Sequence, residues 1–90
     1  MADGNPQHPG DMAAQLELAL DNLEAVLAGA DMTLANIVRL NVYTTDVDEV
    51  IRHFPAINDR FGTSRYATSV LGVAHLPAQF LIMLEATAVD

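Results

Sequence analysis

The stretch IVRLNVYT, residues 37–44, alternates between apolar and polar side chains. A period of two in β-branched and aromatic residues is typical of a strand that buries one face. The sequence therefore predicts a strand over residues 37–44. Its predicted buried positions are Val38, Leu40 and Val42, and its predicted outward positions are Arg39, Asn41 and Tyr43.

One amphipathic helix is predicted before this strand. Apolar residues recur at steps of three and four between Met12 and Leu27, which is the pattern of a single helical face. Asp11 is a suitable N-cap because its carboxylate can accept hydrogen bonds from backbone N–H groups. Gly29 is expected to close the helix, since glycine readily adopts the left-handed conformation.

A second helix is predicted after the strand. It begins near Thr45 or Asp46, where acidic residues suit the positive end of the helix dipole, and it ends at Gly62. Pro55 lies inside this helix and removes one backbone donor. A kink or a break is therefore expected near His53.

The rest of the chain is strand-like and completes an α+β domain. The runs ATSVLGVAHL and AQFLIMLEATAV, residues 67–76 and 78–89, are joined around Pro77, and such neighbours are expected to form an antiparallel pair. The predicted order is helix, strand, helix, strand, strand, with both helices packed on one face of the sheet. Residues 1–10 are predicted to be a loop or tail, and residues 11–90 a single domain.

The composition indicates a small globular domain that associates with a partner. The chain is 51% hydrophobic and 18% charged, so it is not disordered. A core in a 90-residue chain without cysteine has no disulfide to stabilise it. The apolar surplus points to burial against a partner, most simply further copies of the same chain.

The charge argues against nucleic acid as a partner. The formal net charge is −8, and binding to phosphates needs clustered cations. No run of the sequence is apolar enough to span a membrane, and the N-terminus lacks the basic start and apolar core of a signal peptide. With no cysteine either, a cytoplasmic protein without membrane contact is expected. The four arginines are dispersed at Arg39, Arg52, Arg60 and Arg65.

No metal site and no cofactor are expected. The only histidines are His8, His53 and His75, and no two of them have the spacing of metal ligands on a helix. The acidic run TTDVDEV, residues 44–50, lacks the glycine and the distal glutamate of a calcium loop. It is typical of the first turn of a helix.

Glu85 is the residue whose surroundings stand out. It lies within LIMLEATAV, residues 81–89, where five of nine side chains are large and apolar, so burial around its carboxylate is expected. A buried carboxylate must be paired, hydrogen-bonded or protonated. A salt bridge, a hydrogen-bonded anchor and a ligand contact remain open as explanations.

Three segments in order extend this interpretation: GDMAAQLELALDNLEAVLAGA, IVRLNVYTTDVD and VLGVAHLPAQFLIMLEATAV, residues 10–30, 37–48 and 70–89. They resemble the Rid family of reactive intermediate deaminases, also called YjgF-like and sometimes labelled endoribonuclease L-PSP. The resemblance implies a chorismate-mutase-like α+β fold, trimers whose sheets form a central barrel, and small-molecule clefts between subunits. The matched features include Gly10-Asp11 with Gln15, Val42 to Asp46, Leu76-Pro77 and Glu85-Ala86.

The activity that the resemblance implies is hydrolysis of enamine and imine intermediates to 2-keto acids and ammonia. The family's arginine, which clamps the substrate carboxylate through two parallel hydrogen bonds, corresponds to Thr68 here. A glutamate that positions water corresponds to Met83, and an asparagine of the cleft corresponds to Phe54. Because the matching positions carry no charge, ordinary 2-imino acid deamination is expected to be lost.

The resemblance also implies a missing front portion. Rid proteins begin with a hairpin, whereas this sequence begins at what resembles the loop leading into the first helix. We therefore expect an N-terminal truncation relative to the family, and its origin stays open. Two missing strands would leave a sheet edge unpaired.

Together these features predict a Rid-like homotrimer that binds a small metabolite. It is either a hydrolase of enamine or imine metabolites or a non-catalytic binding or scaffold subunit. Ribonuclease activity fits poorly with a net charge of −8. The cleft is predicted to be lined by Thr68, Val70, Met83, Glu85 and Phe54.

Overall fold

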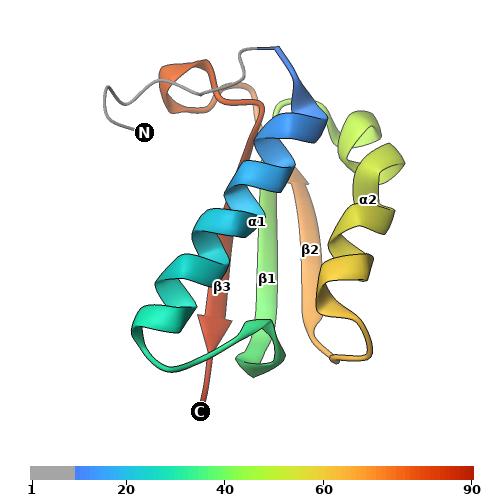
Figure 1. Ribbon diagram of the computed structural model, residues 1–90. Helices are drawn as coiled ribbons and strands as arrows, with labels where there is room; N and C mark the ends of the chain where they lie inside the picture. Colours follow the sequence, from blue (N-terminus) through green and yellow to red (C-terminus); the bar gives the residue numbers. More distant parts are fainter. Residues whose placement is uncertain (1–9) are drawn as a thin grey trace.

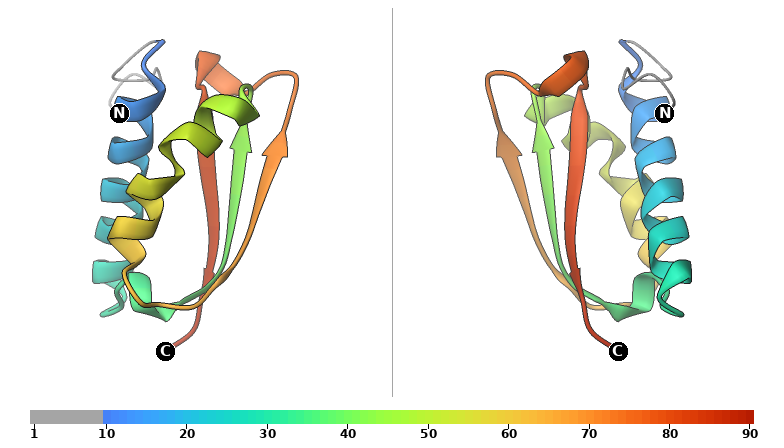
Figure 2. Two further views of the ribbon diagram at one scale, coloured as in Figure 1. Left: turned by 90° about the vertical axis from the view of Figure 1, so that its right-hand side faces the viewer. Right: turned by 90° about the vertical axis from the view of Figure 1, so that its left-hand side faces the viewer.

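The computed structural model describes residues 10–90, which form two helices packed on one face of a three-stranded sheet (Figures 1 and 2). This is the predicted α+β class. Residues 1–9 of the predicted tail, which include His8, lie outside the described residues. The elements are α1 (Met12–Gly29), β1 (Ile37–Thr44), α2 (Val47–Phe61), β2 (Ala67–Gly72) and β3 (Ile82–Ala88), with short 3₁₀ turns at Leu34–Asn36 and Pro77–Gln79.

Strand β1 lies in the middle of the sheet, whose order is β2-β1-β3. It pairs in parallel with β2 and antiparallel with β3. The predicted antiparallel pairing of the last two strands is therefore wrong. The reason is that α2 carries the chain back to the start of β1, as a parallel crossover requires, and the connection after β2 then crosses the end of β1. The amides of Val73 and Thr45 mark this crossing with hydrogen bonds to the carbonyls of Thr44 (2.8 Å) and Leu81 (3.2 Å).

The buried face of β1 is shifted by one residue at its start. A bulge lies between Ile37 and Arg39, and there Ile37 is only 1% exposed while Val38 is 45% exposed. A bulge adds one residue to a strand and so exchanges the faces on either side of it. The predicted burial of Leu40 and Val42 is confirmed, and that of Val38 is wrong.

The helices begin where the sequence predicts, but their ends differ in part from expectation. The carboxylates of Asp11 and Asp46 cap α1 and α2 by accepting hydrogen bonds from backbone amides in the first turn. Gly62, with φ at 61°, closes α2 as predicted. After α1, however, Asp31 takes the left-handed conformation, at φ 59°, in place of Gly29.

Helix α2 continues unbroken through Pro55, so the predicted break near His53 does not occur. The missing N–H of Pro55 would have bonded to the carbonyl of Ile51. Ile51 and Pro55 are both exposed, so water can satisfy that carbonyl on the outer side of the helix. The inner side of α2 keeps its contacts with the sheet.

The core lies between the two helices and the sheet. Each helix contributes its apolar stripe, and the sheet contributes the inward positions of β1 and the start of β3. Burial of this apolar surface is the main stabilising term of the fold. The buried apolar residues are Met12, Leu16, Leu20, Leu27, Leu34, Ile37, Leu40, Val42, Val50, Ile57, Phe61 and Ile82.

Two buried polar side chains hold the backbone of Leu81 at the start of β3. The side-chain oxygen of Gln15 accepts a hydrogen bond of 2.9 Å from the amide of Leu81. The hydroxyl of Thr44 donates to the carbonyl of Leu81 at 2.8 Å and accepts from the amide of Asp46 at 3.0 Å. Thr44 therefore joins the end of β1 to both α2 and β3.

Replacing Thr44 tests this junction. The substitution Thr44→Val keeps the shape but leaves the amide of Asp46 without its partner and removes one of the two hydrogen bonds to the carbonyl of Leu81, so we expect the free energy of unfolding to fall by about 1–3 kcal/mol. Urea denaturation measures the change. The control is Thr87→Val, the same substitution at an exposed position of β3, and an equal loss in both variants would contradict the assigned role of Thr44.

Candidate functional site

The face of the sheet that the helices leave uncovered carries a hydrogen-bonded group of three side chains, Asn41, Tyr43 and Glu85. No described element packs on this face (Figure 2). The register places Asn41 of β1 directly opposite Glu85 of β3. The amide Nδ2 of Asn41 and the hydroxyl of Tyr43 each donate a hydrogen bond of 3.0 Å to Oε1 of Glu85.

These hydrogen bonds fix the protonation state of the group. The hydrogen bond from Asn41, and after it the bond from Tyr43, holds the pKa of Glu85 below its usual 4.5, and desolvation, the smallest of the three effects, acts in the opposite direction. The hydrogen bond from the Tyr43 hydroxyl to Glu85 raises the pKa of Tyr43 above 10.0. At neutral pH the site therefore presents an ionised carboxylate beside a protonated phenol. Among residues 10–90, Oε2 of Glu85 accepts no hydrogen bond and can face a ligand or water.

The shift in Glu85 also links the fold to pH. A carboxyl group with a depressed folded-state pKa stabilises the protein above its unfolded pKa, near 4.5. That contribution is lost as the pH falls through the lower folded-state pKa. Tyr43 acts in the opposite direction: its raised pKa lowers stability as the pH rises past 10.0.

The expectation that burial surrounds Glu85 is wrong, because its side chain is exposed on the uncovered face. The alternation in β3 explains this, since Leu84 and Ala86 point to the core while Met83 and Glu85 point away from it. Of the explanations left open, the structure shows a hydrogen-bonded anchor. The sequence indicated that Asn41 and Tyr43 face outward, but their contact with Glu85 depends on the pairing of β1 with β3.

The predicted cleft residues do not share one face of the sheet. Thr68 and Val70 of β2 lie opposite the core-facing residues of β1, and Val70 packs against the core. Met83 and Glu85 of β3 lie opposite Tyr43 and Asn41 on the uncovered face. The expectation that these four residues lie together is therefore wrong for a single chain.

Phe54, the fifth predicted cleft residue, is on α2 and packs against the core. It belongs to the helix-covered side of the sheet, with Val70 and Thr68. Within one chain the uncovered face thus holds two of the five predicted residues. That all five line a ligand cleft remains a prediction.

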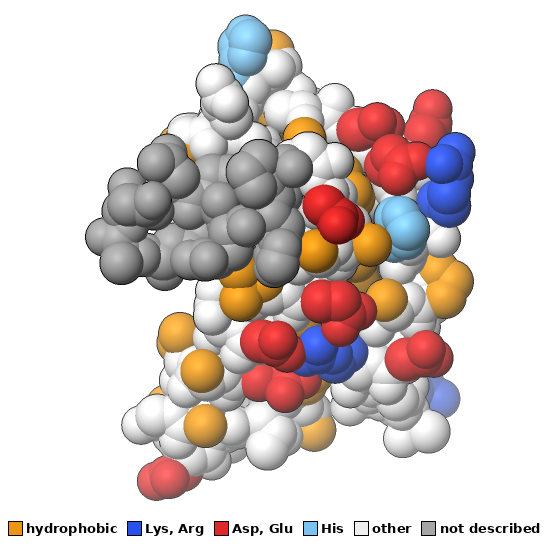
Figure 3. All heavy atoms as spheres, turned by 45° about the horizontal axis from the view of Figure 1, so that its top comes forward, with side chains coloured by type: hydrophobic (Ala, Val, Ile, Leu, Met, Phe, Trp, Pro, Cys, Tyr) orange, Lys and Arg blue, Asp and Glu red, His pale blue; other side chains and the backbone are white. Residues whose placement is uncertain are grey.

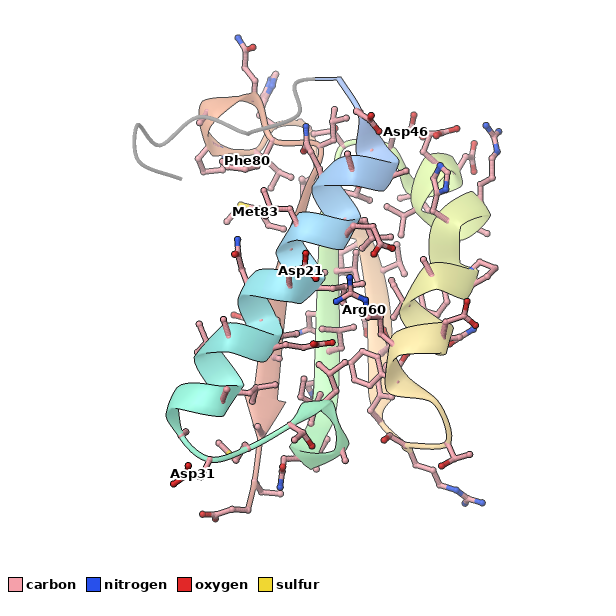
Figure 4. The ribbon with its side chains drawn as sticks, viewed as in Figure 1. Asp21, Asp31, Asp46, Arg60, Phe80 and Met83 are labelled. Atoms are coloured by element: carbon pink, nitrogen blue, oxygen red, sulfur yellow. The ribbon has the colours of Figure 1, made fainter. Side chains whose placement is uncertain are left out.

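A second charged cluster joins the two helices and was not visible in the sequence. Arg60 of α2 forms ion pairs with Glu17 at 2.7 Å, Asp21 at 2.8 Å and Glu24 at 3.3 Å, all on α1. Figure 4 shows Arg60 pointing toward Asp21, and Figure 3 shows one basic side chain enclosed by acidic ones on this side. The bond to Glu17 and the other carboxylates raise the pKa of Arg60.

This cluster is structural in character. The guanidinium of Arg60 already faces three carboxylates, so it offers little to an anionic ligand. A surface pocket of about 480 Å³ lies beside it, between the end of α1 and the end of α2. Its charged lining residues, Glu24 and Arg60, are already paired with each other, so the uncovered sheet face, where Oε2 of Glu85 accepts no hydrogen bond among residues 10–90, is the better candidate site.

Residues 10–90 lack two further features. No group of three His, Asp or Glu side chains there is placed to hold a metal ion. None of the helices in this part of the chain is long and apolar enough to cross a membrane.

The fold, together with the order of the matching segments along the sequence, defines a member of a known family. Two helices on one face of a small mixed sheet are the α+β arrangement of YjgF-like structures, and the sequence profile of the endoribonuclease L-PSP family matches residues 1–90. The chain belongs to this family, also called the Rid or YjgF family.

Relatives with known names agree with this assignment. The chain is 34% identical over 88 residues to the 2-iminobutanoate/2-iminopropanoate deaminase of Escherichia coli, a match that covers 90% of this chain and 66% of the deaminase. It is 30% identical over 79 residues to a RutC family protein of Pyrococcus abyssi, covering 88% of this chain and 62% of that protein. The chain thus spans slightly less than two thirds of these relatives.

Solved structures give the same result. Yeast Mmf1 superimposes with a TM-score of 0.84 at 30% identity, covering 90% of this chain and 65% of Mmf1. The YjgF gene product of Escherichia coli gives a TM-score of 0.80 at 31% identity, covering 92% of this chain and 68% of that one.

The tyrosines provide a direct test of the hydrogen-bonded group. Tyr43 and Tyr66 are the only two tyrosines, and the pKa of Tyr66 is raised by burial alone. We expect the substitution Glu85→Gln to lower the pKa of Tyr43 toward 10.0, because the anion that favours the protonated phenol is removed.

Ultraviolet absorbance of the ionised phenols, followed against pH, measures this change. Tyr66 acts as the internal control and should titrate unchanged in the variant. Two unchanged titrations would contradict the contact between Tyr43 and Glu85.

Proposed function

We propose that the chain is a small-molecule-binding subunit that hydrolyses enamine or imine metabolites. The observation that carries the proposal is the Glu85 carboxylate, held ionised by Asn41 and Tyr43 on an uncovered sheet face. Relatives named as imine deaminases support it.

The chemistry follows from the state of Glu85. In imine hydrolysis, water adds to the carbon of the C=N bond, the C–N bond then breaks, and a keto compound and ammonia leave. A carboxylate with a lowered pKa is a weak base but stays charged. Its role is therefore to orient the water and to stabilise a positively charged iminium nitrogen through Oε2, which is an electrostatic contribution.

The substrate differs from the small 2-imino acids of the named relatives. The resemblance places Thr68 where the family's arginine clamps a carboxylate, and a hydroxyl supplies neither the charge nor the paired hydrogen bonds. It also places Met83 where a glutamate of the family assists the water. A thioether can neither orient water nor exchange a proton with it. Both changes favour a different, more apolar substrate.

The functional unit in this proposal is a homotrimer. Thr68 and Glu85 lie on opposite faces of one sheet, so a single cleft that includes both must form between two copies of the chain. Both β2 and β3 also have one unpaired edge in the described chain, and unpaired edges favour association. No nucleic acid or membrane has a role in this proposal.

The substitution Glu85→Gln tests the proposed chemistry. We expect it to slow ammonia release from freshly generated imines by about 10²- to 10³-fold, the usual loss when one group that stabilises charge electrostatically is removed. The matched control is Asp59→Asn, which neutralises an exposed carboxylate on α2 that makes no ion pair among residues 10–90. Equal rates for Glu85→Gln and the unmodified chain would overturn the role of Glu85.

The alternative function is a non-catalytic trimeric binding or scaffold subunit. The observation that favours it is the pair of large apolar side chains on the uncovered face, Leu71 and Met83, which are 42% and 41% exposed. This alternative predicts assembly without ammonia release from any imine. Light scattering combined with the ammonia assay separates the two functions.

A further inference from the structure

Gln15 is a polar side chain that is buried among apolar neighbours on α1. It is 5% exposed, and Met12 and Leu16 on the same helix are 5% and 1% exposed. Its side-chain oxygen accepts a hydrogen bond of 2.9 Å from the backbone amide of Leu81. In a low-dielectric interior such a bond is stronger than in water, and its loss leaves a buried amide without that partner. The contact therefore ties the first helix firmly to the start of β3.

The residue that Gln15 holds lies directly before the strand that carries Glu85. Strand β3 begins at Ile82, and the register pairs Ile82 with Thr44 and Glu85 with Asn41. Residues of a strand advance by about 3.3 Å each. The position of the residue before β3 therefore decides which residue of β1 faces Glu85.

Groups from both layers of the domain hold the backbone of Leu81. From β1, the hydroxyl of Thr44 and the amide of Thr45 donate to its carbonyl. From α1, Gln15 accepts a hydrogen bond from its amide. The bonds from β1 belong to the two paired strands themselves, so Gln15 is the group that refers the position of β3 to the helix layer.

The apolar pattern of β3 does not select the observed register by itself. A slip of two residues that sets Glu85 opposite Arg39 keeps the alternation between inward and outward side chains. The inward set would change from Ile82, Leu84 and Ala86 to Phe80, Ile82 and Leu84. This slipped register would place a phenylalanine inward in place of an alanine and bring a carboxylate beside a guanidinium. It would also carry Leu81 about 7 Å along the strand, away from Gln15.

We propose that Gln15 is a positioning residue of the Glu85 site, because its hold on the amide of Leu81 favours the register in which Asn41 and Tyr43 donate to Glu85. In the slipped register, Glu85 faces a residue four positions from Tyr43, or about 13 Å along β1. The phenol then loses its bond to the carboxylate. The inference rests on the proposed function only in taking Glu85 as the group that acts on the ligand.

The substitution Gln15→Met tests the inference. Methionine keeps the length of the side chain and its apolar packing, but its sulfur is a weak acceptor, so the slipped register becomes populated. The pKa of Tyr43 is expected to fall toward 10.0, as in Glu85→Gln, because the phenol loses its anionic partner. Ultraviolet absorbance against pH measures the change, and Tyr66 is the internal reference.

Nuclear Overhauser effects between β1 and β3 report the register directly. Glu85 should contact Asn41 in the unmodified chain, and contacts between Glu85 and Arg39 should appear in Gln15→Met. An unchanged pKa of Tyr43 together with unchanged contacts in the folded variant would overturn the inference.

The matched control is Ile57→Val, since Ile57 is fully buried on α2 and its truncation weakens the core without touching Leu81. It should leave the pKa of Tyr43 and the contacts between the strands unchanged. An equal fall of the pKa of Tyr43 in Ile57→Val and Gln15→Met would mean that general loss of stability is the cause, and would also overturn the inference.

Two measurements keep the test decisive if Gln15→Met does not fold. Gln15→Asn keeps the amide but is one methylene shorter, so the pKa of Tyr43 should fall in the same direction, and an unchanged value would contradict the proposed role. In the unmodified chain, the amide proton of Leu81 should exchange slowly with deuterated water. Exchange as fast as in an unstructured peptide would contradict it as well.

Ammonia release from imines is measured in parallel on the same proteins. If the unmodified chain releases no ammonia, the proposed function fails, while the titration of Tyr43 still decides the role of Gln15. If the unmodified chain is active, Gln15→Met should lose activity in step with the fraction of molecules in the slipped register. Failure of the positioning role and failure of the proposed function are thus distinguishable.

Discussion

The pairing of β1 with both other strands is the constraint on which the rest of the structure depends. One side of β1 supplies Leu40 and Val42 to the core, and the other supplies Asn41 and Tyr43 to the candidate site. Because side chains alternate, a shift of one residue in register would exchange core and site. The single irregularity in the register is the bulge after Ile37, and the alternation is regular from Arg39 onward.

The end of β1 carries a second constraint, which fixes where β3 starts. The connection from β2 to β3 passes through Ala78 and Gln79, both left-handed at φ 54° and 62°, and such conformations cost about 1–3 kcal/mol each in residues other than glycine. The hydrogen bonds of Gln15 and Thr44 to Leu81 follow directly after this strained turn. They offset part of its cost and set the register that brings Glu85 opposite Asn41.

The sequence predicts local structure well here and long-range pairing poorly. Both helices, their capping aspartates and the α+β class follow from periodicity and end signals, because these depend on neighbouring residues. The pairing of β3 with β1 could not be predicted, since proximity in sequence favoured a hairpin and the helical crossover overrides it. The outward direction of Asn41 and Tyr43 was predictable, but their bonds to Glu85 required the true pairing.

The overall charge limits which ligands the uncovered face of the proposed subunit would attract. A chain with a net charge of −8 repels anions at long range, so a bound acid needs a local cation that is not already paired. Arg39, on the uncovered face, forms no ion pair among residues 10–90, whereas three carboxylates surround Arg60. Glu85, ionised beside Arg39, would repel a simple anion but attract a molecule with a positive nitrogen next to its carboxylate. In the proposed function these two charges would therefore favour a zwitterionic ligand over a ligand with one charge alone.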